Sequence, residues 1–265
     1  MDRNGFVAFG SGTAVGTLGG LIGLGGAEFR LPVLVGLLAM TPRAAVPMNL
    51  VISLVTLVAA LLGRGAGLSF APLLLLWPAI LGLVAGGIAS ALWGAKVLSR
   101  LSDRRLALVL AALLIAIGLW LAIESFLPDH DGQGLAPTDA ALRILIGAMF
   151  GLLIGAVAAL LGVAGGELLI PTFMFVFGAD VVTAGTASIV VSLVLVPTAL
   201  RRYGRFAMLP GRERIKAIAV PMGAGSVVGA LLGGFAVGLV APAVLKLILG
   251  VVLIVSSAKI FAGRH

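Results

Sequence analysis

Three ionisable residues lie within apolar sequence, and these side chains have the greatest potential for chemistry. They are Glu28, Arg30 and Glu167, whereas nearly every other charge can be assigned to a loop or to the end of an apolar segment. An ionisable group at membrane depth is costly and usually faces a cavity or a partner. Glu28 and Glu167 are predicted either to cap short helices or to exchange protons. Arg30 is predicted either to attract anions at one mouth or to extend toward lipid headgroups.

A glycine pair stands just before each of the two glutamates. The pairs are Gly25-Gly26 and Gly165-Gly166. Glycine favours unwound backbone, and a helix that starts there presents N–H donors and a partial positive charge to an anion. We therefore predict that the four glycines bind a small oxyanion through main-chain N–H groups. The alternative is that they only permit close helix packing.

Short polar side chains with helical spacing complete the set of candidates. They are Asn49, Ser53 and Thr56 in one apolar segment, and Thr186, Ser188 and Ser192 in another. Residues four apart lie on one helix face, so Asn49 pairs with Ser53 and Ser188 with Ser192. Their hydroxyl and amide groups can donate to the oxygens of an anion. Hydrogen bonding between helices is the alternative role for each of them.

The elements that position these residues must be membrane helices. Apolar residues form 61% of the chain and charged residues 11%, with a mean hydropathy of +1.23. Several apolar segments are about 20 residues long, enough to cross a bilayer. The absence of cysteine excludes disulfides, thiol catalysis and Cys-type zinc sites. The two histidines, His130 and His265, stand in polar or terminal segments, so no metal site is predicted.

The chain repeats itself at an offset of 139 residues. Gly23–Pro32 aligns with Gly162–Pro171, and glycines and serines elsewhere align without a gap. Each half contains five apolar segments, the second of which is too short to span comfortably. In the first half these are about 6–24, 29–40, 44–62, 70–97 and 106–126. In the second half they are about 141–161, 168–177, 181–200, 215–239 and 243–262.

Loop charges predict how the halves are oriented. Basic residues gather in 96–105 and 201–216, which the positive-inside rule places in the cytoplasm, whereas the acidic linker 127–140 is placed outside. The repeat partner of 201–216, about 63–69, must then be outside, so the halves 1–126 and 141–265 are inverted. The predicted fold is an all-α integral membrane protein with two inverted-topology repeats. Each repeat has about four full spans plus a short helix that either crosses or re-enters, and both termini are cytoplasmic.

Inverted repeats with glycine-broken segments at matching positions are typical of the binding site of secondary transporters. The motif Gly-x-Gly-Gly-x-Glu-x-x-x-Pro at Gly23–Pro32, its variant at Gly162–Pro171 and the following Asn/Ser helix resemble the TauE/SafE (TSUP) family of sulfite exporters. The resemblance covers essentially the whole chain. It implies a permease of the bacterial inner membrane for sulfite, sulfonates such as sulfoacetate, or thiosulfate. The two copies of the motif differ at one glycine position: the first copy has Ala27 where the second copy has Gly166.

Other functions are less consistent with the sequence. No Walker loop, HExxH motif or plausible Ser/His/Asp set is present, so neither an enzyme nor a cofactor is predicted. The basic residues that give the chain its net charge of +8 cluster at helix ends, where they orient a membrane protein, so no nucleic-acid partner is expected. The alternatives are a non-transporting scaffold or a carrier of another small organic anion. The expected partners are a sulfur-containing anion and the lipid bilayer, with protons as a candidate coupling ion; small-residue patches would permit a homodimer.

Overall fold

The computed structural model describes most of both halves of the chain. The described residues are 3–22, 25–65, 71–100, 134–161, 163, 165–205 and 211–236, together with 102, 108, 112, 115, 116, 119, 123, 241, 244 and 247. Every regular element among them is a helix, which confirms the all-α prediction. The first half contains α1 (Arg3–Ile22), α2 (Ala27–Pro32), η1 (Val33–Leu37), α3 (Pro42–Gly65), η2 (Ala71–Leu76) and α4 (Trp77–Arg100). The second half contains α6 (Ala140–Leu161), α7 (Gly166–Pro171), η3 (Thr172–Val176), α8 (Val181–Arg205), α9 (Arg212–Arg214), η4 (Ile215–Ala219) and α10 (Val220–Phe235).

These elements follow the predicted apolar segments closely. The short second segment of each half is a six-residue α-helix that continues directly into a π-helical turn, as α2 with η1 and α7 with η3. The last predicted segments of the two halves, 106–126 and 243–262, lie mostly outside the described residues.

Five of the described helical segments are long and apolar enough to cross a membrane. They are Pro42–Gly65, Ala71–Ser90, Ala140–Ala158, Val182–Arg205 and Arg212–Phe235. Large apolar side chains point outward from them, among them Leu62, Leu75 and Leu153, each at least two-thirds exposed. An outer surface of this kind is suited to hydrocarbon rather than to water.

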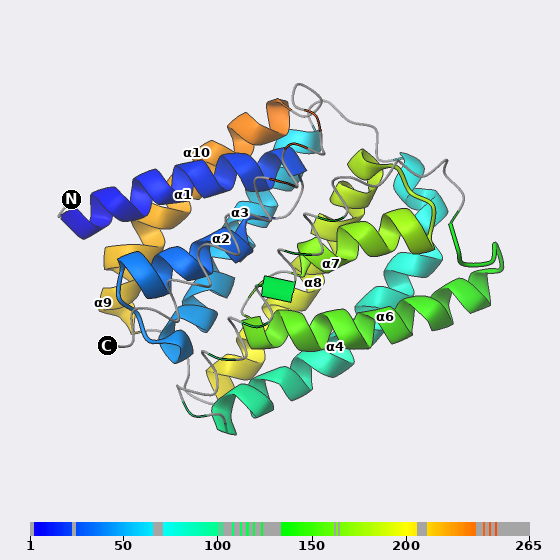
Figure 1. The fold of residues 1–265 in the computed structure, drawn as a ribbon, viewed down its shortest axis with the longest axis horizontal. Coiled ribbons are helices and arrows are strands. Elements are labelled where there is room, and N and C mark those ends of the chain that lie inside the picture. Colours follow the sequence, from blue (N-terminus) through cyan, green and yellow to red (C-terminus); the bar gives the residue numbers. More distant parts are fainter. Residues whose placement is uncertain are drawn as a thin grey trace.

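The described helices form two groups, each with helices from both halves (Figure 1). In one group, α1 packs along α10, and α3 packs on α10 and α2. In the other, α4 packs along α6, and α8 packs on α4 and α7. The groups meet where α3 contacts α8.

Glycines make the closest helix contacts, and these contacts recur at the 139-residue offset. A Cβ atom on Gly12 of α1 would clash with the carbonyl oxygen of Met222 of α10. A Cβ atom on Gly151 of α6 would clash in the same way with Leu83 of α4. Gly151 follows Gly12 by 139 residues, and Met222 follows Leu83 by the same number. Small residues let helix backbones approach closely in membranes, so these glycines set the α1–α10 and α4–α6 packing.

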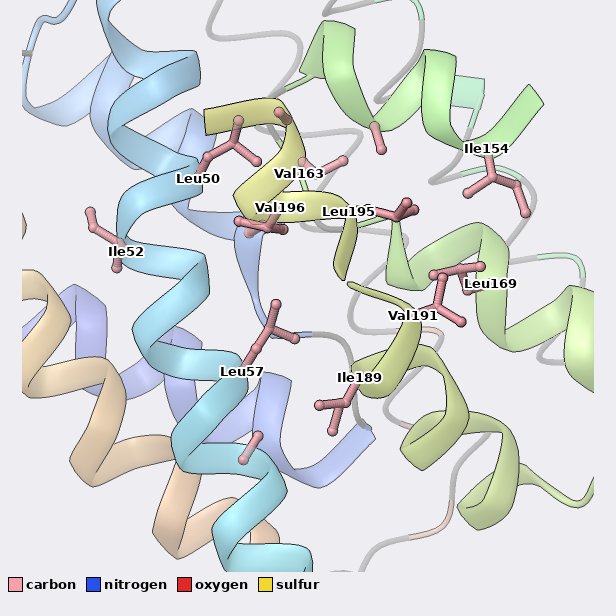
Figure 2. Packing of buried hydrophobic residues seen from close by; sticks show 14 of the residues in the cluster. Leu50, Ile52, Leu57, Ile154, Val163, Leu169, Ile189, Val191, Leu195 and Val196 are labelled. Carbon is pink, nitrogen blue, oxygen red and sulfur yellow. The ribbon is translucent and has the colours of Figure 1, made fainter. Parts of the chain in front are cut away.

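The central helices α3 and α8 are the most enclosed of the spans. Of the apolar stretch of each, 67% and 61% is buried, compared with 22% for α6. Figure 2 shows Leu50 of α3 near Val196 of α8, and Leu57 near Ile189. Residue numbers rise along α3 as they fall along α8, so the two helices run in opposite directions (Figure 1).

Candidate functional site

The two glycine breaks have the same backbone geometry. Gly26 caps α2 with φ = 68°, and Gly165 caps α7 with φ = 79°; Gly25 is also left-handed, with φ = 70°. Left-handed backbone is tolerated by glycine and strained for other residues, which explains the need for glycine here. Gly166 was predicted to be part of the unwound pair, but it is already the first residue of α7. The breaks therefore involve a pair of left-handed glycines in the first half and a single described one in the second.

The polar face of α3 packs against the first break. The Asn49 side chain donates a 2.7 Å hydrogen bond from Nδ2 to the carbonyl oxygen of Ala27, the first residue of α2. Ser53 lies one turn further along α3 and is also fully buried. Asn49 and Ser53 thus share one helix face, as predicted, and this face contacts the start of the broken segment.

Arg30 extends from α2 into this polar face. Its guanidinium donates to Thr56 Oγ1 at 2.7 Å, to Ser53 Oγ at 3.3 Å and to the carbonyl oxygen of Gly25. The side chain is fully buried. The interpretation that Arg30 extends to lipid headgroups is therefore wrong, because its charge is held inside the bundle by hydroxyl and carbonyl oxygens.

The hydroxyl groups of α3 act mainly as acceptors toward Arg30. Ser53 Oγ donates to the carbonyl oxygen of Asn49 at 2.7 Å, and Thr56 Oγ1 donates to that of Ile52 at 2.9 Å. Each hydroxyl proton is thus used within α3, which leaves its lone pairs for the guanidinium. In this conformation Ser53 and Thr56 orient Arg30 rather than offer protons to an anion.

The equivalent positions of the second half are also buried, but they lack the arginine. Ser188 and Ser192 of α8 are buried, and the Ser188 hydroxyl has no hydrogen-bond partner among the described residues. The residue 139 positions after Arg30 is Leu169, also fully buried. Thr186 donates to the carbonyl oxygen of Val182 at 2.9 Å and accepts a hydrogen bond from an arginine of α3.

The sequence did not single out Arg64. It was assigned to a loop, but it lies in the last turn of α3 and is 1% exposed. Its guanidinium donates to Thr186 Oγ1 at 3.1 Å and to carbonyl oxygens of Val182, Gly20 and Leu21 at 3.2, 3.5 and 3.3 Å. Two arginines, Arg30 and Arg64, are therefore buried between the described helices. Its repeat partner in α8 is Tyr203, so the repeat offers no matching charge that would have drawn attention to Arg64.

Two predicted roles concern side chains outside the described part of the structure. The backbone places Glu28 and Glu167 in the first turns of α2 and α7. Their side chains are not among those described, so capping and proton exchange both stay predictions. Among the described residues, no three metal-binding side chains lie together.

A small recess lies on the apolar side of the α3–α8 contact. Its lining is formed by Leu50, Gly155, Ala158, Val163, Leu195, Val196 and Ala199. Figure 2 labels four of these residues, Leu50, Val163, Leu195 and Val196. None of the predicted polar site residues contributes to it. The recess therefore offers an anion no partner, and the polar features gather instead around Arg30 and Arg64.

The fold and these buried polar groups define a multi-pass helical membrane protein with charged groups enclosed between its spans. The class is that of membrane transport proteins, which the comparison with known families specifies further. The chain belongs to the family described as sulfite exporter TauE/SafE, which matches residues 8–260. The resemblance seen in the sequence is thereby confirmed. No curated protein and no solved structure matches the chain.

Proposed function

We propose that the protein is a secondary transporter that moves small sulfur-containing anions, such as sulfite, sulfonates and thiosulfate, across the bacterial inner membrane. Membership of the sulfite exporter TauE/SafE family supports an anion as substrate. The observation that supports a binding site most directly is Arg30, a fully buried guanidinium at a helix break. A buried cation in surroundings of low polarity attracts an anion far more strongly than one in water.

In the proposed site, the anion lies between the guanidinium of Arg30 and the first turns of the broken helices. Thr56 and Ser53 hold the guanidinium in one orientation, so less side-chain freedom is lost when an anion binds. Main-chain N–H groups near Gly26 and Gly165 add donors and a partial positive charge. Ser188, whose hydroxyl has no partner within the described part of the chain, is the candidate donor from the second half. Apolar side chains of α3 and α8 exclude water.

The arrangement of helices supports alternating access. The α1–α10 and α4–α6 contacts are related by the same offset, and α3 and α8 run in opposite directions. This is the geometry expected if two inverted halves exchange roles as the passage opens on one side and then the other. An inside-negative potential favours outward movement of an anion by about 2.3 kcal/mol per charge per 100 mV. Export therefore needs no coupling ion.

The experiment is an anion panel on the protein reconstituted in liposomes. Sulfite, sulfoacetate, thiosulfate, sulfate and acetate are compared as substrates in flux measurements. We expect flux of the sulfur oxyanions to exceed flux of acetate, and to follow an imposed membrane potential. Flux of none of the sulfur anions, or equal flux of acetate, would refute the proposed substrate class.

Proton coupling is tested separately with Glu28→Gln and Glu167→Gln. If either glutamate exchanges protons during transport, the pH dependence of flux flattens in its variant. If both variants keep the unaltered pH profile, neither glutamate couples transport to protons.

A further inference from the structure

Arg64 forms a polar junction between three helices from both halves of the chain. The arginine belongs to α3, its carbonyl partners Gly20 and Leu21 to the last turn of α1, and Val182 and Thr186 to the first turns of α8. α1 and α3 belong to one group of helices and α8 to the other. The Arg64 guanidinium therefore bridges the two groups.

The charge of Arg64 is poorly matched by these partners. All four are neutral oxygens, and the nitrogen-to-oxygen distances run from 3.1 to 3.5 Å. Arg30, by comparison, makes a bond of 2.7 Å to Thr56. The Nε atom of Arg64 is buried and has no hydrogen-bond partner among the described residues. A desolvated guanidinium gains most from an oxyanion, which accepts two short, charge-assisted hydrogen bonds in a planar fork.

The junction lies at one end of the bundle, and Arg30 lies deeper. Thr56, which holds Arg30, precedes Arg64 by eight residues of α3, an axial distance of about 12 Å. At the equivalent positions of the second half are Leu169 and Tyr203, both fully buried. The two described buried cations therefore both belong to the first half of the chain.

We propose that the Arg64 junction is a second anion-binding station, at one mouth of the passage. A small oxyanion binds there when the two groups of helices separate, replacing the contacts of Arg64 with Val182 and Thr186. The anion exchanges between this station and Arg30, and an exported anion leaves Arg30 by way of Arg64. This inference rests on the proposed transport function and assigns to Arg64 the attraction of the anion at that mouth.

The test compares Arg64→Gln, Arg64→Lys and the control Arg205→Gln, whose arginine is exposed at the end of α8. For each, the KM for sulfite and for sulfoacetate is measured in liposomes, and the melting temperature in detergent. We expect Arg64→Gln to raise KM at least about tenfold, as for the loss of a charged hydrogen-bond donor. Arg64→Lys keeps the charge but cannot make the paired hydrogen bonds of a planar guanidinium, so its KM is expected to rise by about threefold or more. Arg205→Gln leaves KM unchanged.

The two readouts separate binding from a merely structural link. A melting temperature that falls in Arg64→Gln with KM unchanged would show that Arg64 only ties helices together, and the station would be refuted. If Arg64→Gln does not fold, an unchanged KM in Arg64→Lys refutes it equally. Absence of sulfur-anion flux in the unaltered protein would instead refute the proposed function itself.

Discussion

The guanidinium of Arg30 donates a 2.7 Å hydrogen bond to the hydroxyl of Thr56, joining the short helix α2 to the middle of α3. Both side chains are fully buried. The bond fixes a positive charge beside the glycine break, at a depth where water cannot screen it.

Replacement of Arg30 by leucine is expected to reduce sulfite flux at least about tenfold, because the charge-assisted contacts to the anion are lost. Leucine is the residue of the second half at this position, Leu169, so the fold accommodates it there. Thr56 and Ser53 keep their own acceptors in α3, so no hydroxyl proton is left without a partner. Flux in liposomes is the measurement, with Arg201→Gln, an exposed arginine, as the control. Normal flux in Arg30→Leu would remove Arg30 from the site.

Alanine in place of Gly26 is expected to destabilise the protein by about 1–2 kcal/mol through left-handed backbone strain alone. A Cβ atom there would also meet the Val15 side chain and carbonyl oxygen of α1 at 2.7 Å. At Gly165 the nearest atom, on Ile154, is 3.1 Å away, so the same change costs less. Thermal unfolding in detergent measures the difference. Gly36→Ala is the matched control, since nothing lies within 4 Å of its Cβ position. Equal melting temperatures for Gly26→Ala and Gly36→Ala would contradict the described break.

Much of this architecture follows from the sequence, and the exceptions have physical reasons. Long apolar segments predict helices because the bilayer requires internal backbone hydrogen bonds. The glycine breaks are predictable because few other residues tolerate their φ angles. The burial of Arg64 could not be predicted, because it depends on contacts with Thr186 and Val182, which lie more than 110 residues away in the chain. The apolar run ends near Leu62, whereas α3 continues to Gly65, so a charge there resembles a loop residue.

The direction of the α3 hydroxyls could not be predicted either. Helical spacing places Asn49 and Ser53 on one face, but it does not reveal what that face contacts. Ser53 donates to its own helix and accepts from Arg30, whereas the sequence suggested a donor to the anion. A hydroxyl can serve as either, and only the approach of α2 decides between them.

Asp180 is expected to stabilise the start of α8 in a pH-dependent manner. Its carboxylate accepts hydrogen bonds of 3.0 Å from the main-chain N–H groups of Val182 and Thr183. Partial burial raises the pKa of Asp180, but these hydrogen bonds outweigh it, so its pKa lies below the ordinary value. A lowered pKa in the folded state means that the stabilisation is complete above the ordinary aspartate pKa. It is lost as the pH falls through the folded-state value.

The variants Asp180→Ala and Asp180→Asn test this cap by thermal unfolding over a range of pH. Alanine removes the acceptor and is expected to cost about 1 kcal/mol at neutral pH, with a cost that shrinks in acid. Asparagine keeps an acceptor oxygen, so it is expected to retain most of the stability without the pH dependence. A cost of Asp180→Ala that is the same at all pH values would exclude the carboxylate as the cap.

The opposite directions of α3 and α8 predict that their final residues lie on opposite sides of the membrane. Gly65 and Gly204 are exposed residues at these two ends, 139 positions apart, and the chain has no cysteine of its own. Single variants Gly65→Cys and Gly204→Cys can therefore be labelled in intact cells with a membrane-impermeant maleimide. Because basic residues follow Gly204, the positive-inside rule places it in the cytoplasm, so only Gly65→Cys is expected to react before the cells are opened. If both variants reacted from the same side, α3 and α8 could not be equivalent helices of inverted halves, and alternating access by exchange of those halves would have to be abandoned.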